Sequence, residues 1–341
     1  MKGLLKFCFE ATKGEDAPDI SDPEKVLNDM EPQRRRWLEE ALGSMSVDIV
    51  QQLTNGIKIL NSEAEDEVKE EVLDQLEDWL GNIDMAVNFH KVGGLPSLQR
   101  CLASSSPGVR AGACNLVAEI CQNNPYCQHQ LAEEGWLQLL LAQLDSDTHP
   151  SCRVKALYAI SCMARDSPPL LAKLGALDGW SVVLRAVQRG EEKLTTKGCY
   201  LLGCAARASE AAAAQMVEMG MVAQLAGSLH AEFSPAHEQL LGALLALATV
   251  SPAARTEARD AGLGLEQLLV ARRGELGGRE EHLESAEHCE ALLRLLAPDF
   301  VPTEAWQEVQ EWQAVPPGCH VKVDLQTGKK MARREEQTAD R

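Results

Sequence analysis

The sequence predicts an all-α chain in which a unit of about 42 residues repeats, a length found in helical repeat proteins. A glycine follows a short apolar stretch at five positions, which are Gly94, Gly135, Gly179, Gly220 and Gly262. The nearly constant spacing of these glycines is typical of a helical solenoid. Each unit reads as two short helices and one longer apolar helix. The pattern predicts an armadillo-like helical solenoid of about four to five repeats with helical caps.

Composition agrees with helices packed on helices. The chain has 341 residues, of which 45% are hydrophobic and only 4% aromatic. A solenoid of four or five such repeats accounts for about 200 residues and leaves flanking segments at both ends. The segments Trp136–Leu144 and Arg153–Arg165 show the second and third helix of one unit.

The charge excludes several classes of partner. A formal net charge of −18 argues against nucleic acid and against an anionic membrane, because both require a basic surface. The apolar tip at residues 1–9 is interrupted by Lys6 and followed by Glu10, unlike the core of a secretory signal. Eleven cysteines lie mostly in apolar helical surroundings and are expected to be reduced. We therefore expect a cytoplasmic protein.

Four segments are expected along the chain. Residues 1–33, with three prolines, are predicted to form a flexible N-terminal segment, and residues 34–93 a helical cap with a degenerate first repeat. Residues 94–297 are predicted to hold the armadillo repeats and a capping helix. Residues 298–341 are predicted to form a largely flexible tail, with a short extended or hairpin piece within 315–328.

No motif for catalysis or cofactor binding occurs. The phosphate-binding glycine loops, the nucleophile elbow and the zinc-protease helix motif are all missing from the sequence. The nearest metal-like group is His282, His288 and Cys289, but spacings of six and seven residues do not converge on one helix face. We expect no enzyme activity, no cofactor and no metal.

The concave face, which the third helix of each repeat lines, is the informative surface. Peptide-binding armadillo proteins resembling the nuclear import receptors keep an asparagine there to grip an extended backbone. In this chain that position is held by Cys162, and stepping by one repeat gives Asp78, Glu119, Cys204 and Ala246. The groove is therefore predicted to suit a folded partner better than an unfolded peptide, although these side chains could also be merely solvated.

Several segments resemble one family throughout residues 34–297. They are Asn82–Ala86, Gln122–Pro125, Val154–Arg165, Met219–Val222 and Gly262–Leu269. They are similar to the cytosolic binding protein and nucleotide exchange factor of the 70-kDa heat-shock chaperone. One departure is that the family's E-N-L/M-D-N-A stretch reads G-N-I-D-M-A here. The stretch 315–328 is similar to a segment that precedes the repeats in the family's endoplasmic-reticulum branch.

This resemblance implies a function that the repeat pattern does not. In that family the armadillo arc clasps one lobe of the chaperone's ATPase domain and opens the cleft, so that ADP leaves and substrate follows. Contact residues implied by motif match are Asn82, Asp84, Ala86, Asn123, Lys155 and Arg165, and those obtained by stepping one repeat are Glu119 and Arg207. The alternative is an armadillo adaptor that binds another folded protein.

The N-terminal tip suggests a second contact. Leu4, Leu5, Phe7 and Phe9 lie beside Lys2 and Lys6, a composition that the chaperone's substrate-binding domain would accept. In fungal family members a similar flexible segment helps to expel substrate by mimicry. The tip could instead fold as an amphipathic turn onto the cap helix.

Overall fold

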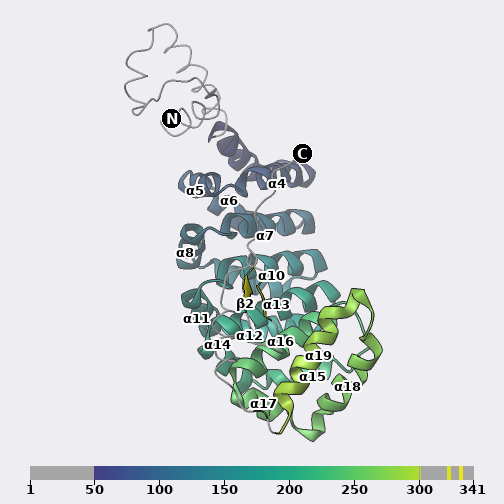
Figure 1. Cartoon of the computed structure of the whole chain (residues 1–341). Helices are drawn as coiled ribbons and strands as arrows, with labels where there is room; N and C mark the ends of the chain where they lie inside the picture. The colour runs from purple at the N-terminus through teal and green to yellow at the C-terminus, as the bar shows by residue number, and fades with distance from the viewer. Residues whose placement is uncertain (1–49, 299, 301–320, 324–329, 333–341) are drawn as a thin grey trace, which may run out of the picture.

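The computed structural model describes residues 50–298, 300, 321–323 and 330–332. Within this part the chain is a stack of helical layers, with the first layer at α4 and the last at α18 and α19 (Figure 1). Three rows of helices run through the stack, one row for each helix of the repeat. The armadillo prediction is confirmed.

The first row consists of short helices along one edge of the stack. They are α5 (Ile83–Lys91), α8 (Pro125–Glu133), α11 (Pro168–Ala176), α14 (Glu210–Glu218) and α17 (Pro252–Ala258). The second row is α6 (Leu95–Leu102), α9 (Trp136–Ser146), α12 (Gly179–Gln188), α15 (Met221–Ser228) and α18 (Leu265–Leu276). A 3₁₀ turn, η1 (Ala261–Leu263), separates α17 from α18.

The third row holds the longer helices, called the groove helices below. They are α4 (Asp66–Leu80), α7 (Pro107–Cys121), α10 (Pro150–Ala164), α13 (Glu192–Ala208), α16 (Ala236–Val250) and α19 (Leu283–Leu296). Each groove helix packs on the next one along the row. The predicted capping helix is α19, which a 3₁₀ turn, η2 (Glu280–His282), precedes.

The turn between the first and second helix of each repeat needs a left-handed residue. Gly135 (φ 85°) and Gly220 (φ 68°) supply it as the sequence predicts, since glycine adopts positive φ without steric cost. In three repeats the prediction misses the position. Gly93 (φ 79°) takes the role expected of Gly94, whose own φ is −72°. Asp178 (φ 57°) takes the role expected of Gly179, and Gly264 (φ 59°) takes the role expected of Gly262.

Proline sets the start of several helices. Pro107, Pro125, Pro150, Pro168 and Pro252 occupy the first turn of α7, α8, α10, α11 and α17. Proline is favoured there because its missing N–H has no intrahelical partner and its φ is preset for a helix. The residue before the proline often caps the helix as well, as the Ser106 hydroxyl does for the Gly108 and Val109 amides.

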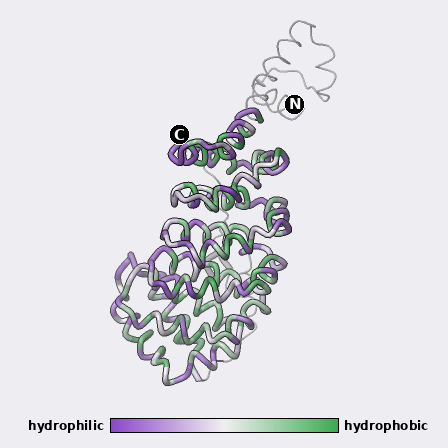
Figure 2. Tube along the Cα trace, turned by 180° about the vertical axis from the view of Figure 1, so that it is seen from behind, coloured by the Kyte–Doolittle hydropathy of each residue, from purple (hydrophilic) through white to green (hydrophobic). Residues whose placement is uncertain are grey.

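A continuous apolar core runs through all layers. Trp136, Trp180 and Phe89 are its largest fully buried side chains, and the helix that covers residues 50–60 joins it through Leu53 and Leu60. Figure 2 shows hydrophobic segments recurring in every layer instead of gathering in one place. Each repeat therefore buries its apolar face against its neighbours, as the one-dimensional logic of solenoids requires.

The tail contains one element of another kind. Strands β1 (Val321–Val323) and β2 (Lys330–Ala332) pair antiparallel, with Val321 opposite Ala332. β1 lies within the 315–328 stretch for which an extended or hairpin piece is predicted, whereas β2 follows it. Among the helices that the structure describes, none is both long and apolar enough to cross a membrane.

Candidate functional site

The groove helices divide the described surface into three charged zones. The first acidic zone consists of Glu77 on α4 and Glu119 on α7. The cationic zone consists of Lys155 and Arg165 at α10 and Lys197 and Arg207 on α13. The second acidic zone consists of Glu238 on α16 and Glu284 and Glu287 on α19. A positive zone between two negative ones is notable in a chain of net charge −18.

The first acidic zone meets the cationic zone at Glu119. Burial raises the pKa of the half-buried Glu119 carboxyl, and the nearby Glu77 raises it further, while Lys155 opposes the rise. The Lys155 ammonium donates a hydrogen bond to Asn115 Oδ1 at 2.7 Å. Both predicted contact residues therefore lie on neighbouring groove helices with their charges close together.

Arg165 and Arg207 occupy equivalent places at the ends of their helices. Arg165 is the C-cap of α10, and its Nε donates to Asp166 Oδ2 at 3.2 Å. Arg207 lies in the last turn of α13, with Nη2 3.6 Å from the Cys204 sulfur. A cation at this end of a helix is also favoured by the helix dipole. Stepping by one repeat from Arg165, which the motif match gave, thus leads to Arg207 near the end of the next groove helix.

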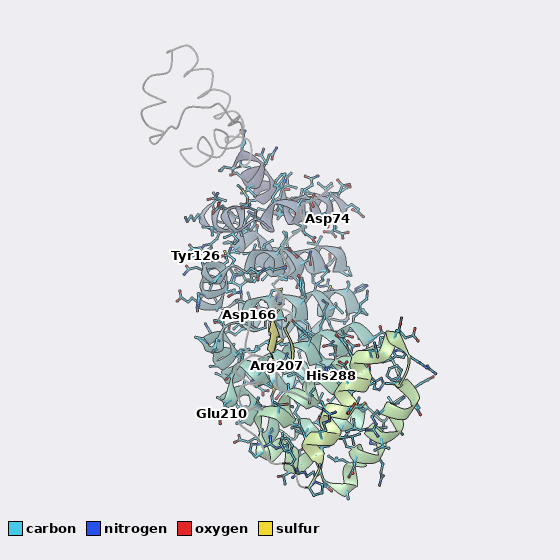
Figure 3. The ribbon with its side chains drawn as sticks, in the orientation of Figure 1. Asp74, Tyr126, Asp166, Arg207, Glu210 and His288 are labelled. Atoms are coloured by element: carbon cyan, nitrogen blue, oxygen red, sulfur yellow. The ribbon has the colours of Figure 1, made fainter. Side chains whose placement is uncertain are left out.

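Arg207 also adjoins the second acidic zone. Figure 3 shows it close to His288. Burial lowers the pKa of the His288 imidazole, and the Arg207 charge lowers it further, while Glu284 and Glu287 oppose the change. The Nδ1 atom of His288 is buried and has no hydrogen-bond partner in the described part of the chain. His288 therefore lies between Arg207 and the carboxylates of the second acidic zone.

Asn82 and Asn123 lie in the turns that follow the groove helices α4 and α7, and Asp84 lies in the first turn of α5. Asn82 caps α5, where its Oδ1 accepts from the Asp84 amide at 3.0 Å and from the Met85 amide at 3.3 Å. Asn123 has φ 53° and follows α7. Asn82, Asp84 and Asn123 are all exposed. All three side chains are therefore accessible to a partner, although Asn82 also caps α5.

The prediction of Ala86 as a contact residue needs correction. Ala86 is 1% exposed, so it packs in the core of α5 and does not face a partner. At the asparagine position of peptide-binding armadillos, Cys162 is buried, as the apolar setting of the cysteines predicts, and Ala246 is buried as well. Cys204, which holds that position on α13, is half-buried beside Arg207. The longer half-buried and exposed side chains of the groove helices, and not these small buried residues, therefore form the surface open to a partner.

Three residues of the groove helices were not predicted as contact residues from the sequence. Tyr158, Lys197 and Tyr200 lie on the same helix faces as the predicted residues, and the Lys197 ammonium stands 4.5 Å from the centroid of the Tyr158 ring. Their signal in the sequence is the repeat period, because Lys197 and Tyr200 follow Lys155 and Tyr158 by one repeat.

The described residues offer little for ligand chemistry. They contain no cluster of three metal-ligating side chains, and their nine cysteines are unpaired. The imidazole of His282, which belongs to the metal-like group of the sequence, packs edge-on against the Phe233 ring. The tip residues Leu4, Leu5, Phe7 and Phe9 lie outside the described residues.

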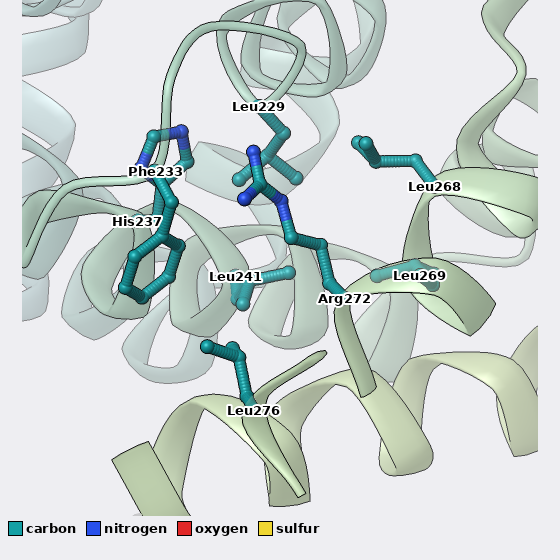
Figure 4. A pocket seen from close by; sticks show the side chains of 8 residues that line it. All are labelled: Leu229, Phe233, His237, Leu241, Leu268, Leu269, Arg272 and Leu276. Atoms are coloured by element: carbon teal, nitrogen blue, oxygen red, sulfur yellow. The ribbon is translucent and has the colours of Figure 1, made fainter. Parts of the chain in front are cut away.

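Two hollows in the described part are too small or too open for a typical ligand site. The first, of about 10 Å³, lies among the residues shown in Figure 4, where Phe233 is stacked on His237 and covered by Arg272. That volume is about enough for one water molecule. The second, of about 260 Å³, is open and lies between residues 52–59 and α4. Ligand pockets are commonly about 300–1,000 Å³.

Comparison with known proteins decides the family. The chain is 36% identical over 309 residues to Hsp70-binding protein 1 of Mus musculus, covering 86% of this chain and 85% of that protein. The Homo sapiens protein of the same name is 35% identical over 86% of this chain and 84% of its own length. This chain belongs to the Hsp70-binding protein 1, Fes1 and Sil1 family.

Three family models divide the chain. The model described as "Nucleotide exchange factor Fes1" matches residues 1–89, and "SIL1/FES1/HPBP1 C-terminal domain" matches residues 85–178. The tail matches "Nucleotide exchange factor Sil1 small beta-sheet domain" over residues 300–328, which include β1. The resemblance of the tail to a segment of the family's other branch is thereby confirmed.

Solved structures support the fold alone. A designed armadillo repeat protein, YIII(Dq)4CqI, superposes with a TM-score of 0.61 at 20% identity, covering 72% of this chain and 100% of the design. An engineered protein, target OR366, gives a TM-score of 0.62 at 17% identity over 72% of this chain and 98% of its own.

Proposed function

We propose that this member of the Hsp70-binding protein 1, Fes1 and Sil1 family is a nucleotide exchange factor for a 70-kDa heat-shock chaperone. The observation that carries the proposal is the identity of 36% to mouse Hsp70-binding protein 1, which extends over 86% of the chain. The groove supplies the binding surface, because its charged side chains are half-buried and continuous across several helices. An adaptor for another folded protein remains the alternative outcome of the test.

The groove performs no bond chemistry under this proposal. It binds the open, nucleotide-poor form of the chaperone's ATPase domain more tightly than the closed ADP form, since a ligand shifts an equilibrium only by its differential affinity. A thousandfold faster ADP release corresponds to a barrier lower by about 4 kcal/mol. A curved interface of standard size, dominated by a few anchor residues, can supply such a difference.

The contact residues assigned to this interaction are exposed or half-buried and lie along the groove and its edge. They are Asn82, Asp84, Glu119, Asn123, Lys155, Arg165 and Arg207. We place the interaction in the cytoplasm, where reduced thiols are stable; the nine unpaired cysteines of the described residues support this.

The test is the release of a fluorescent ADP analogue from the chaperone, measured by stopped flow with and without the full-length protein. We expect release to be faster with the protein, and the isolated ATPase domain to respond as the whole chaperone does. Binding to the chaperone without faster release would favour an adaptor. No binding to the ATPase domain would contradict the proposal.

A further inference from the structure

The cationic zone is built from one motif that occurs twice. Lys155, Tyr158, Cys162 and Arg165 of α10 recur one repeat later as Lys197, Tyr200, Cys204 and Arg207 of α13. The offsets of three, seven and ten residues place all four side chains on one face of each helix. One repeat further, on α16, the same positions hold Gln239, Gly242, Ala246 and Thr249. The motif is therefore present on α10 and α13 but absent from α16. Each of the two copies is called a rung below.

The two rungs interlock. The Lys197 ammonium of the second rung stands 4.5 Å from the centroid of the Tyr158 ring of the first, a cation–π contact. The Tyr158 hydroxyl in turn donates to Gln122 Oε1 at 3.1 Å, which directs that side chain toward α7. In each rung the arginine approaches the cysteine three residues before it, at 3.9 Å for Arg165 and 3.6 Å for Arg207. The side chains are thus positioned before any partner arrives.

The positive charge of the rungs is balanced only in part by the described residues, through Asp166 beside Arg165 and Glu119 near Lys155. Asp166, which is half exposed, pairs with Arg165, and Lys155 donates to a neutral amide. Lys197 and Arg207 have no carboxylate at ion-pair distance among the residues that the structure describes. Burial lowers the pKa of the Lys197 ammonium, and the neighbouring cations Lys155, Arg165 and Lys193 lower it further. An anion placed between the rungs would relieve this repulsion.

The acidic zones on either side limit what that anion can be. Glu77 and Glu119 lie before the rungs, and Glu238, Glu284 and Glu287 lie after them. A long polyanion such as a nucleic acid would run from the rungs into these carboxylates, and the net charge of −18 would repel it at a distance. A short acidic stretch of a protein matches the pattern, because its neighbours on each side can be basic or neutral.

We infer that the two Lys-Tyr-Cys-Arg rungs of α10 and α13 form a receptor for paired carboxylates on an acidic segment of the protein partner. This inference rests on the proposed function, in which the partner is the chaperone. Packed helices lie about 8–10 Å apart, so the carboxylates that the rungs receive are separated by about that distance. Arginine and lysine supply charge-assisted hydrogen bonds, and the tyrosine hydroxyls supply neutral ones.

The test uses two double variants of the full-length protein and a matched control. Lys155→Gln with Arg165→Gln removes the charge of the first rung, and Lys197→Gln with Arg207→Gln removes that of the second. The control is Arg185→Gln with Arg189→Gln, which removes two exposed cations at the end of α12. The probe is a fluorescent peptide of alternating aspartate and glycine, with a lysine–glycine peptide as the reversed-charge comparison. Thermal melting checks that each variant folds.

The acidic peptide is expected to bind the native chain and the control equally. Each rung variant should bind it at least about tenfold more weakly, since truncating a charged anchor typically costs at least that factor. The dependence of binding on salt, between about 50 and 200 mM, should weaken in each rung variant because fewer counterions are released. Any binding of the lysine–glycine peptide to the acidic zones should not weaken in the rung variants. Equal binding by native and rung variants, or tighter binding of a single-stranded oligonucleotide than of the peptide, would overturn the inference.

Chaperone binding by the same proteins separates this inference from the proposed function. One outcome is that the chaperone binds the native chain, and that both the chaperone and the peptide bind the rung variants as tightly as the native chain. In that case the receptor is refuted and the exchange function stands. If the peptide distinguishes the variants but the chaperone does not bind, the receptor stands and its partner is another acidic protein.

Discussion

A buried ion pair between repeats should make stability depend on one carboxylate. The Arg110 guanidinium of α7 donates to both oxygens of Asp147, at 2.7 and 3.0 Å, and Asp147 stands between α9 and α10. The Asp147 side chain is only 2% exposed, and its Oδ1 also accepts from the His149 amide at 2.8 Å. The pair thus joins three helices at the boundary between two repeats.

The strength of this pair follows from the pKa of Asp147. The hydrogen bond from Arg110 lowers that pKa from 3.8 to about 2. A shift of one unit corresponds to about 1.4 kcal/mol, so the carboxylate contributes on the order of 2 kcal/mol to folding when it is ionised. Because the pKa is lowered in the folded state, this contribution is complete above about pH 4 and is lost as the pH falls through about 2.

The assay is urea unfolding followed by circular dichroism at a series of pH values. Asp147→Asn should lower the free energy of unfolding by about 2 kcal/mol at pH 7, and the difference from the native chain should shrink as the pH falls below about 4. Asp145→Asn is the matched control. Its bidentate pair with Arg185 has similar distances, 3.0 and 2.9 Å, but the two side chains are 40% and 48% exposed.

Exposed pairs contribute only about 0–1 kcal/mol, so the control variant should lose much less stability. Equal losses in the two variants would refute the argument from burial. A difference between native and Asp147→Asn protein that does not change with pH would refute the argument from the lowered pKa.

Three further predictions concern function and compartment. Arg165→Ala should weaken chaperone binding at least about tenfold while the melting temperature moves by only a few degrees, because among the described residues its one ion pair is with the half-exposed Asp166. Unchanged affinity in a binding titration would return Arg165 to a purely structural role at the helix end. Deleting residues 1–12 should leave ADP release intact and slow the release of a labelled substrate peptide, and an equal loss of both rates would rule out substrate mimicry by the tip. Thiol titration of the denatured protein from its native compartment should give a value near eleven, the number of cysteines in the chain; several disulfides would contradict a cytoplasmic location.

The repeat architecture could be predicted because one physical requirement recurs in every unit. Each turn into the second helix needs a left-handed residue, and glycine marks it at Gly135 and Gly220. The rule is less reliable where another residue tolerates positive φ. Asp178 does so next to Gly179, which is why the glycine pattern alone misplaces that turn by one residue.

The groove was predicted only in part, because it depends on how neighbouring helices are offset. Repeat stepping correctly places Arg207 in the same helical position as Arg165. It cannot show that Lys197 reaches the Tyr158 ring on the preceding helix, since that contact depends on the packing of the two helices. Motif matching alone also fails for Ala86, whose burial depends on its neighbours in the stack and not on its own motif.

The central claim is that the groove of this solenoid promotes nucleotide exchange on the chaperone. The most direct measurement is the rate of fluorescent ADP release with the native protein, with Lys197→Gln/Arg207→Gln and with the α12 control Arg185→Gln/Arg189→Gln, each at the same subsaturating concentration. We predict fast release with the native protein and the control, and at least about tenfold less acceleration with the groove variant. Equal acceleration by all three proteins would show that exchange does not depend on the groove.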